Sequence, residues 1–240
     1  MRLDKYITEI KNCTRNRAQF FIEQELVFVN DICITKASYE VKEWYIVRVL
    51  EDKRIGFVSR SAIKLDTFID EINLDVTNMS GLDIGASTGG FTQVLLSRWI
   101  KSVHTVDVGT LQLHSSLQAD SRVIALENTD IRYFRTTVHF DIIVGDISFI
   151  SLMKLIDSIL ALADNKTEII ILYKPQFEVG SEHLRKTGVP KSEAIVTKRF
   201  AEFQELLREK GVLIKKISLS SLIWEAGNKE YLLWLQKKES

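Results

Sequence analysis

The stretch Leu82-Asp83-Ile84-Gly85-Ala86-Ser87-Thr88-Gly89-Gly90-Phe91 decides the fold. Its apolar start predicts a buried strand, its glycines predict a tight turn, and a helical pattern begins at Phe91. A strand, a glycine-rich turn and a helix in this order bring bare backbone close to a nucleotide-like ligand. The same glycines also fit a tight turn that binds nothing, so the ligand needs support from elsewhere in the chain.

The residues around this turn favour one nucleotide ligand over another. A dinucleotide site requires glycine at the second position of G-x-G-x-x-G, where the pyrophosphate approaches the main chain, and Ser87 occupies that position. Asp83 would repel a pyrophosphate and could hold an amine. Asp107, at the end of the next apolar strand, is placed to accept from a ribose diol. The pattern therefore favours S-adenosylmethionine over NAD.

Composition and charge narrow the class of protein. The chain has 240 residues, of which 45% are hydrophobic and 27% charged, as in a globular protein with one large core and a small module. The charged start lacks the apolar stretch of a signal peptide, and no window approaches the roughly 18 apolar residues of a membrane span. We therefore expect a cytoplasmic protein with no membrane partner. The scattered cysteines and histidines lack metal-ligand spacing, so no metal site is expected.

Alternating segments after residue 58 predict the main domain. Helices are expected at 60–72, 91–99, 151–162 and 192–210, and strands at 81–84, 103–107, 123–126, 141–144, 168–173, 212–219 and 231–236. This alternation is typical of an α/β fold with a doubly wound, largely parallel, Rossmann-like sheet. Ligands of such sheets lie at the carboxyl ends of the strands. The domains are expected at 1–50 and 59–240, with a charged linker at 51–58.

The amino-terminal segment predicts a small α+β module. Thr14 caps a helix at 15–25, and strands are expected at 27–29, 32–34 and 44–50, with a turn at Asn30-Asp31. Residues 1–64 carry twelve Lys and Arg against nine Asp and Glu, although the whole chain is neutral. Cations on such a module can contact phosphates, but the same pattern is as often an ordinary exposed face. The candidate RNA-binding residues are Arg2, Lys5, Lys11, Arg15, Arg17, Lys36 and Arg60.

Polar residues follow the central strands, where a plain apolar core has no use for them. Asp130, Asp146 and Lys174 each come just after an expected strand. A lysine at the end of a buried strand is costly to desolvate unless it is paired with an acidic group. Asp146, at an equivalent strand end, is its expected partner.

The motifs also carry a family resemblance. R-L-D-K-Y, T-R-N-R-A-Q, L-V-F-V-N and T-K-A-S-Y resemble the small RNA-binding module first known in ribosomal protein S-four. Together with V-S-R-S-A-I-K-L, V-D-V-G, D-I-S-F-I-S-L, K-P-Q-F-E-V-G and G-N-K-E-Y-L-L, the chain resembles the TlyA family, which joins that module to an FtsJ-like methyltransferase domain. The resemblance covers nearly the whole chain. It implies transfer of a methyl group from S-adenosylmethionine to the ribose 2′-hydroxyl of a cytidine in ribosomal RNA.

The resemblance assigns a catalytic tetrad and a cofactor site. The tetrad is Lys64, Asp146, Lys174 and Glu230, with Glu225 as a nearby alternative for the glutamate. Asp107 would bind the cofactor ribose, Asp130 the adenine amine, and Asp83 would lie near the methionine end. The full set of expected cofactor residues is Asp83, Gly85, Ala86, Ser87, Thr88, Gly89, Gly90, Asp107, Val108, Asp130 and Asp146.

The chemistry leaves the role of Lys174 open. A ribose hydroxyl is a poor nucleophile, so the protein must align it with the methyl group and help to remove its proton. A free lysine, with a pKa of about 10.4, is almost wholly protonated at neutral pH. Lys174 is therefore either a base that has lost its proton or a group that only orients the hydroxyl.

Departures from the family and two rival functions remain. Ser61-Ala62, Thr110-Leu111 and the segment 224–226 replace the family's usual residues in substrate-side loops, which puts the choice of RNA site in doubt. Family members have also been labelled haemolysins, so a membrane-acting cytolysin is one rival. An RNA-binding protein without catalysis is the other.

Overall fold

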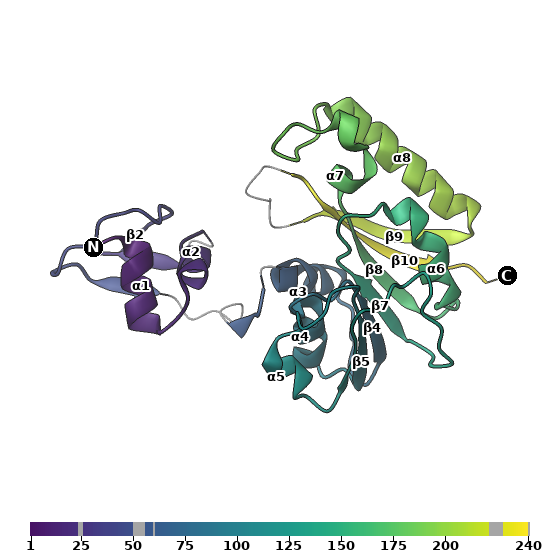
Figure 1. Cartoon of the computed structure of the whole chain (residues 1–240), viewed down its shortest axis with the longest axis horizontal. Helices are drawn as coiled ribbons and strands as arrows, with labels where there is room; N and C mark the ends of the chain where they lie inside the picture. The colour runs from purple at the N-terminus through teal and green to yellow at the C-terminus, as the bar shows by residue number, and fades with distance from the viewer. Residues whose placement is uncertain (24–25, 50–55, 60, 221–227, 240) are drawn as a thin grey trace. The chain divides into compact units, whose positions relative to one another are not determined.

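The computed structural model describes residues 1–23, 26–49, 56–59, 61–220 and 228–239. The chain divides into two compact units, Met1–Phe57 and Val58–Ser240 (Figure 1). The expected linker at 51–58 falls largely outside the described residues. The domain limits proposed from the sequence therefore stay a prediction.

The first unit combines two helices with a small antiparallel sheet of order β2-β1-β3. Its elements are α1 (Leu3–Lys11), α2 (Arg15–Glu23), β1 (Val27–Val29), β2 (Ile32–Cys33) and β3 (Val47–Val49). The Thr14 hydroxyl accepts from the backbone N–H of Arg17, as expected of a helix cap. Asn30 and Asp31 both have positive φ, which a two-residue hairpin turn of this kind requires. The third strand is shorter than expected, and Trp44 precedes it as an exposed side chain.

The second unit is built on a seven-stranded sheet of order β6-β5-β4-β7-β8-β10-β9. Its strands are β4 (Ser80–Ile84), β5 (Ser102–Val106), β6 (Val123–Leu126), β7 (Ile142–Gly145), β8 (Glu168–Tyr173), β9 (Val212–Leu219) and β10 (Tyr231–Lys237). The pairs among β4 to β8 are parallel, whereas β10 runs antiparallel to β8 and β9. Because β10 returns between β8 and β9, its first residues meet the carboxyl end of β8.

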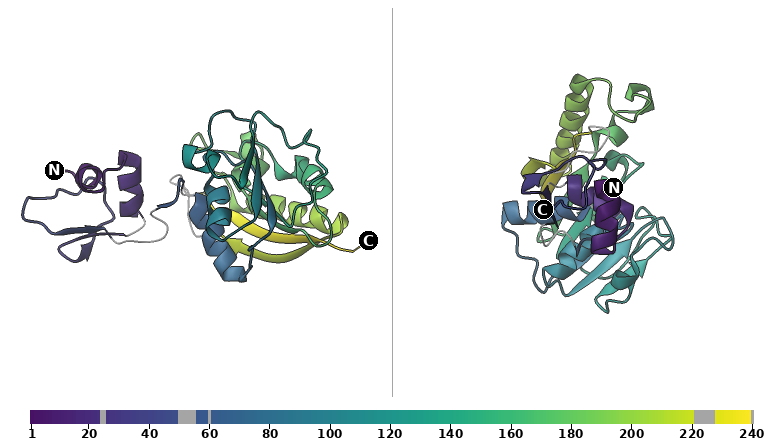
Figure 2. Two further views of the ribbon diagram at one scale, coloured as in Figure 1. Left: turned by 90° about the horizontal axis from the view of Figure 1, so that it is seen from below. Right: turned by 90° about the vertical axis from the view of Figure 1, so that its left-hand side faces the viewer.

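Helices cover both faces of this sheet, which confirms the expected doubly wound fold. α3, α4 and α5 lie on one side, and α6 and α8 on the other (Figures 1 and 2). The helical segments are α3 (Ser61–Ile72), α4 (Gly90–Ser97), α5 (Ser115–Gln118), η2 (Leu152–Lys154), α6 (Ile156–Ala161), α7 (Pro175–Glu178), η3 (Ser181–His183) and α8 (Glu193–Glu209). β7 is buried along its whole length, and β8 from Ile169 to Tyr173, which explains their continuous apolar sequence.

Several helical segments differ from the sequence expectation. The helix expected at 151–162 is divided into η2 and α6, and its start is bonded to Glu178 on α7. The carboxylate of Glu178 accepts from the Ser151 hydroxyl at 2.5 Å and from the Leu152 backbone N–H at 2.7 Å. The short segments α5, α7 and η3 were not expected, because three or four residues are too few to show helical periodicity.

Candidate active site

The glycine-rich turn lies against the carboxyl ends of β4, β5 and β7. Gly85 has a φ of 75°, and its backbone N–H donates to the Val106 carbonyl at 2.8 Å. A Cβ at this position would lie 3.2 Å from the Asp146 carbonyl oxygen. Gly90 begins α4, and a side chain there would collide with the hydroxyls of Ser59 and Ser61. The glycines therefore allow positive φ and bring the turn close to two neighbouring segments.

Asp107 joins the turn to the loop after β5. Its carboxylate accepts from the backbone N–H of Ser87 at 2.8 Å and from that of Gly109 at 2.7 Å. A carboxylate has about four acceptor sites, so the two remaining lone pairs are free to receive hydroxyl donors. The next residue, Val108, exposes its apolar side chain beside this carboxylate. This arrangement suits a nucleoside, because the Asp107 carboxylate can bind the ribose hydroxyls and the Val108 side chain can contact the base.

Asp83 is fully buried beneath the turn. One carboxylate oxygen accepts from the Thr92 hydroxyl at 2.6 Å, while no described residue donates to the other. Burial, which disfavours the charged form, raises the pKa of Asp83 to about 7. A buried carboxylate oxygen without a donor is costly, so this position favours a ligand or water that can donate.

Asp130 is engaged by a neighbour instead of facing an open site. The guanidinium of Arg132 donates to both of its oxygens, with distances between 2.6 and 3.0 Å. These hydrogen bonds hold the pKa of Asp130 below its ordinary value. An adenine amine at this carboxylate would share it with Arg132, so its expected role stays a prediction.

Lys174 is buried at the end of β8 and is paired as expected. Its Nζ lies 2.6 Å from Oδ1 of Asp146 and donates to the Ser148 hydroxyl at 2.7 Å. Asp146 directly follows β7, and its backbone N–H donates to the Ile84 carbonyl at 3.2 Å. The ends of three adjacent strands therefore place Lys174 and Asp146 together, next to the glycine-rich turn.

Lys64 and Glu230 form a second buried ion pair. Nζ of Lys64, on α3, lies 2.5 Å from Oε2 of Glu230, and Glu230 is 0% exposed. The side-chain amide of Gln176 donates to the other Glu230 oxygen at 3.0 Å. Because Tyr231 pairs with Tyr173, the preceding Glu230 lies across from Lys174 at the same edge of the sheet. The structure thus gathers all four proposed tetrad residues.

Three site residues were not expected from the sequence, namely Ser148, Phe149 and Gln176. Ser148 and Gln176 contact the tetrad through the bonds described above. Phe149 is 91% exposed, has a positive φ, and its ring lies 5.3 Å from that of Phe177. A bulky residue at positive φ is an outlier that often marks a functional loop. The sequence motifs D-I-S-F and K-P-Q could have pointed to these residues, because each motif directly follows a strand.

The alternative glutamate Glu225 and the candidate RNA-binding residue Arg60 lie outside the described residues.

The candidate RNA-binding cations of the first unit are held in different ways. The buried carboxylate of Asp4 accepts from Arg2 at 3.1 and 3.0 Å and from Arg15 at 2.9 Å. Arg17 is half-buried, because it donates to the Phe57 carbonyl at 2.6 Å and stacks over Phe20 and Phe21. Exposed side chains complete the set, at Lys5, Lys11 and Lys36.

Two protein-family models match the chain. The model of the FtsJ-like methyltransferase family matches residues 57–237. The chain belongs to the FtsJ-like methyltransferase family. The S4 domain model matches residues 1–43 of this methyltransferase. These matches, with the relatives below, confirm the resemblance given by the sequence.

Relatives match this methyltransferase over nearly its full length. It is 36% identical to a protein of Campylobacter jejuni named 23S rRNA (cytidine-2'-O)-methyltransferase TlyA, covering 99% of this chain and 100% of the relative. It is 33% identical to the 16S/23S rRNA (cytidine-2'-O)-methyltransferase TlyA of Mycobacterium tuberculosis, covering 93% and 84%. A solved structure from Streptococcus thermophilus, described as a candidate hemolysin, superposes with a TM-score of 0.74 at 31% identity, covering 100% and 89%.

The described part of the chain adds two observations on other classes of function. No helix within it is both long and apolar enough to cross a bilayer. The same residues contain no group of three or more His, Cys, Asp or Glu side chains arranged to hold a metal ion.

Proposed function

We propose that this chain transfers the methyl group of S-adenosylmethionine to the ribose 2′-hydroxyl of a cytidine in ribosomal RNA. The observation that carries the proposal is the pair of buried ion pairs, Lys174 with Asp146 and Lys64 with Glu230, beside the glycine-rich turn. Two of the relatives described above carry names for this reaction. Membership of a methyltransferase family supports the reaction type.

The bonding of Lys174 suits proton transfer from a hydroxyl. A neutral lysine amine has two N–H groups and one lone pair. The Ser148 hydroxyl accepts a hydrogen bond from Nζ at 2.7 Å, and Oδ1 of Asp146 lies 2.6 Å from Nζ as its ion-pair partner, without hydrogen-bond alignment. When one N–H group is directed at Ser148 and the other turns toward Asp146, the lone pair is left for the proton of the substrate hydroxyl. In the charged form the third N–H occupies that direction and donates to the hydroxyl oxygen, which orients it.

The second ion pair fixes the wall of the same site. Lys64 neutralises Glu230 in a dry environment, and Gln176 occupies the other Glu230 oxygen. Removing one member of a buried pair leaves an uncompensated charge, so each holds the other in place. We infer that Lys64 and Glu230 position the acceptor ribose, while Lys174 accepts the proton of its 2′-hydroxyl or orients that hydroxyl.

The donor half of the site fits S-adenosylmethionine, which supplies an electrophilic sulfonium methyl group when bound. Asp107 offers acceptor sites for ribose hydroxyls at the end of β5. The unpartnered oxygen of Asp83 suits a donor such as the amino group of the methionine moiety. The turn from Gly85 to Gly90 supplies a backbone surface between these two carboxylates.

An RNA acceptor is supported by two further features. The exposed ring of Phe149 follows Ser148, beside the proposed proton acceptor, where an unpaired base can stack. The S4 domain match in the first unit adds exposed cations on two helices. Both features suit a single-stranded or looped RNA segment better than a protein or small-molecule acceptor.

The test is methylation of defined RNA. The purified chain is incubated with S-adenosylmethionine labelled at the methyl group and with separated ribosomal subunits or naked ribosomal RNA, and the modified nucleotide is mapped. We expect one labelled cytidine whose 2′-oxygen carries the methyl group. Label on a base, or on a ribosomal protein, would contradict the proposal.

A further inference from the structure

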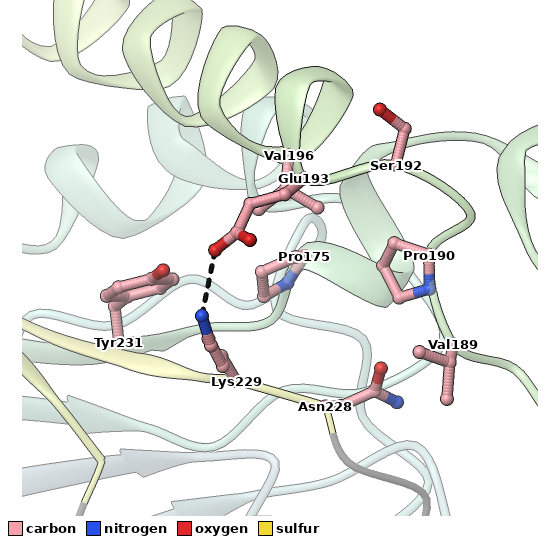
Figure 3. A pocket seen from close by; sticks show the side chains of 9 residues that line it. All are labelled: Pro175, Val189, Pro190, Ser192, Glu193, Val196, Asn228, Lys229 and Tyr231. Carbon is pink, nitrogen blue, oxygen red and sulfur yellow. Dashed lines mark hydrogen bonds and ion pairs between the residues drawn. The ribbon is translucent and has the colours of Figure 1, made fainter.

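A small pocket opens beside the proposed reaction centre and plays no part in the mechanism above (Figure 3). Its volume is about 150 Å³. Pro175 follows Lys174 directly, and Asn228 and Tyr231 flank Lys229 and Glu230, so two walls continue from catalytic segments. The other walls come from the loop before α8 and from its first turn, at Val189, Pro190 and Val196.

Asn228 gives this pocket a buried polar group, beside Ser192 and the ion pair of Lys229 with Glu193 at 2.8 Å, which also line it. Its side chain is 6% exposed, and its amide nitrogen donates to the Gly188 carbonyl at 3.4 Å. The Gly188 carbonyl can only accept, so the amide must face it with nitrogen, which leaves the Asn228 oxygen directed away. Within the described part of the chain no group donates to this oxygen. Figure 3 shows it pointing into the space between Pro175 and Pro190. A ligand with an N–H donor would satisfy it.

The size and walls of the pocket select one kind of ligand. A cavity of about 150 Å³ is the size known to hold a benzene ring, so it suits one six-membered ring and is small for a purine. Proline, valine and tyrosine side chains provide the apolar contact that a flat ring prefers. Tyr231 is itself held by stacking on Phe200, with ring centroids 4.7 Å apart.

The loop that forms one wall of the pocket is basic. The loop that supplies Val189 and Pro190 also carries exposed Arg185, Lys186 and Lys191. Its backbone is closed by a hydrogen bond from Arg185 N–H to the Val189 carbonyl at 2.8 Å. Cations around a ring-sized pocket suit the phosphates on either side of an inserted base.

We propose that this pocket binds an unpaired cytosine of the RNA, whose exocyclic amine donates to the side-chain oxygen of Asn228. The proposal rests on the function proposed above, because it takes RNA as the substrate. Uracil carries a carbonyl oxygen in place of that amine and would face Asn228 acceptor to acceptor. The cytosine is either that of the methylated nucleotide or that of a neighbour in the same strand.

Binding of homopolymers tests the pocket without needing catalysis. The full chain is titrated into fluorescently labelled decacytidylate and decauridylate at one fixed salt concentration, and anisotropy is measured. We expect the cytidylate to bind about fivefold more tightly, as the gain of one hydrogen bond implies. Asn228→Leu should bring the ratio of the two affinities to about one. Lys186→Ala, the matched control, should weaken both equally, because it loses only a phosphate contact.

Val196→Phe, which places a ring in the pocket from α8 and keeps Asn228, should also abolish the preference. It carries the test if Asn228→Leu does not fold. Equal binding of the two polymers by the wild-type chain would overturn the proposal, as would an unchanged ratio in both variants. A cytidylate preference without any RNA methylation would instead contradict the proposed function and leave the pocket assignment standing.

Methylation of altered transcripts then identifies which cytosine is bound. The mapped acceptor, or each cytosine next to it, is replaced by uridine. The replacement that slows the wild-type chain about fivefold but leaves Asn228→Leu unaffected marks the nucleotide in the pocket. If no such position exists among the acceptor and its neighbours, the pocket does not read cytosine.

Discussion

The two units of this molecule use charge in opposite ways. In the first unit one buried carboxylate, Asp4, holds two arginines whose side chains are 49% and 60% exposed. In the second unit Lys64 and Lys174 are themselves buried, each against its own carboxylate. The first arrangement leaves the cations exposed to solvent, while the second withdraws them from water.

We attribute the difference to the functions proposed for the two units. Exposed cations raise the affinity of a protein for a polyanion, because binding releases the counterions of the polyanion, and this effect needs no fixed geometry. A proton acceptor and its neighbours need fixed positions and a dry site, where electrostatic interactions are stronger. Changes in the second unit should therefore alter rate, and changes in the first unit should alter RNA affinity and local stability.

The largest expected effect is that of Lys174→Ala. Loss of a positioned proton acceptor typically lowers the rate by about 10²–10⁴-fold, so methylation should nearly vanish. Binding of S-adenosylhomocysteine, measured by calorimetry, should persist. Lys174→Arg is the matched control, because it keeps the cation but cannot give up its proton. Substantial activity in Lys174→Arg would show that the residue only orients the hydroxyl.

Asp4→Asn tests the other side of the comparison. The hydrogen bond from Arg2 is the main reason that the pKa of Asp4 lies below its ordinary value. A lowered pKa means that its stabilising contribution is present above about pH 4 and is lost as the pH falls through the folded-state value. The substitution should destabilise the first unit at pH 7 by about 2 kcal/mol.

Hydrogen exchange of peptides from α1 and α2 measures this loss. RNA affinity should fall as Arg2 and Arg15 lose their guide, while the cofactor site should be unaffected. Thr77→Ala, which removes a surface hydroxyl of the second unit, serves as a control with no expected change in α1 or α2. Unchanged exchange in Asp4→Asn would show that Asp4 does not organise the helix pair.

A smaller effect is expected from the pH dependence of cofactor binding. With the pKa of Asp83 at about 7, the carboxyl is mostly neutral at pH 6 and mostly charged at pH 8. If its charged form receives the cofactor amine, affinity for S-adenosylhomocysteine should rise about tenfold between these values. Asp83→Asn should remove the dependence. Stability has the opposite sign, because a raised pKa makes ionisation destabilising as the pH rises from about 4 to 7.

That sign difference separates a binding role from a structural one. If Asp83 serves only packing, Asp83→Asn will flatten the pH dependence of the melting temperature and leave affinity unchanged. Thr92→Val is a useful companion, since it removes the hydroxyl that donates to Asp83 at 2.6 Å. It should raise the carboxyl pKa further and move the affinity change to higher pH.

Structural features could be predicted from the sequence where the interacting residues lie close together along the chain. The long apolar strands and the α8 helix show their periodicity locally, and the structure confirms them. The break between η2 and α6 was missed, because the bonding group, Glu178, lies 26 residues beyond Leu152. Likewise α7 is too short to leave a periodic signal.

The same reasoning applies to the site. Pairing of Lys174 with Asp146 could be predicted, because ends of neighbouring parallel strands meet at one edge of the sheet. Pairing of Lys64 with Glu230 could not, since it depends on where α3 lies relative to the antiparallel β10. The resemblance named Lys64 as a tetrad member without a partner, whereas the structure gives it a carboxylate of its own.

The smallest expected effect concerns Gln176, which contacts the second ion pair without carrying charge. Gln176→Leu removes its hydrogen bond to Glu230 while Lys64 continues to neutralise that carboxylate. The loss of one neutral-to-charged hydrogen bond should lower kcat about fivefold and leave the KM for S-adenosylmethionine unchanged. Gln176→Glu should lower kcat further, because it places a second carboxylate beside Glu230 and leaves only Lys64 to neutralise the two charges. Equal activities for wild type and both variants would show that Lys64 alone holds Glu230. In that case the buried ion pair of the second unit would depend on neighbouring side chains no more than the exposed arginines of the first unit do.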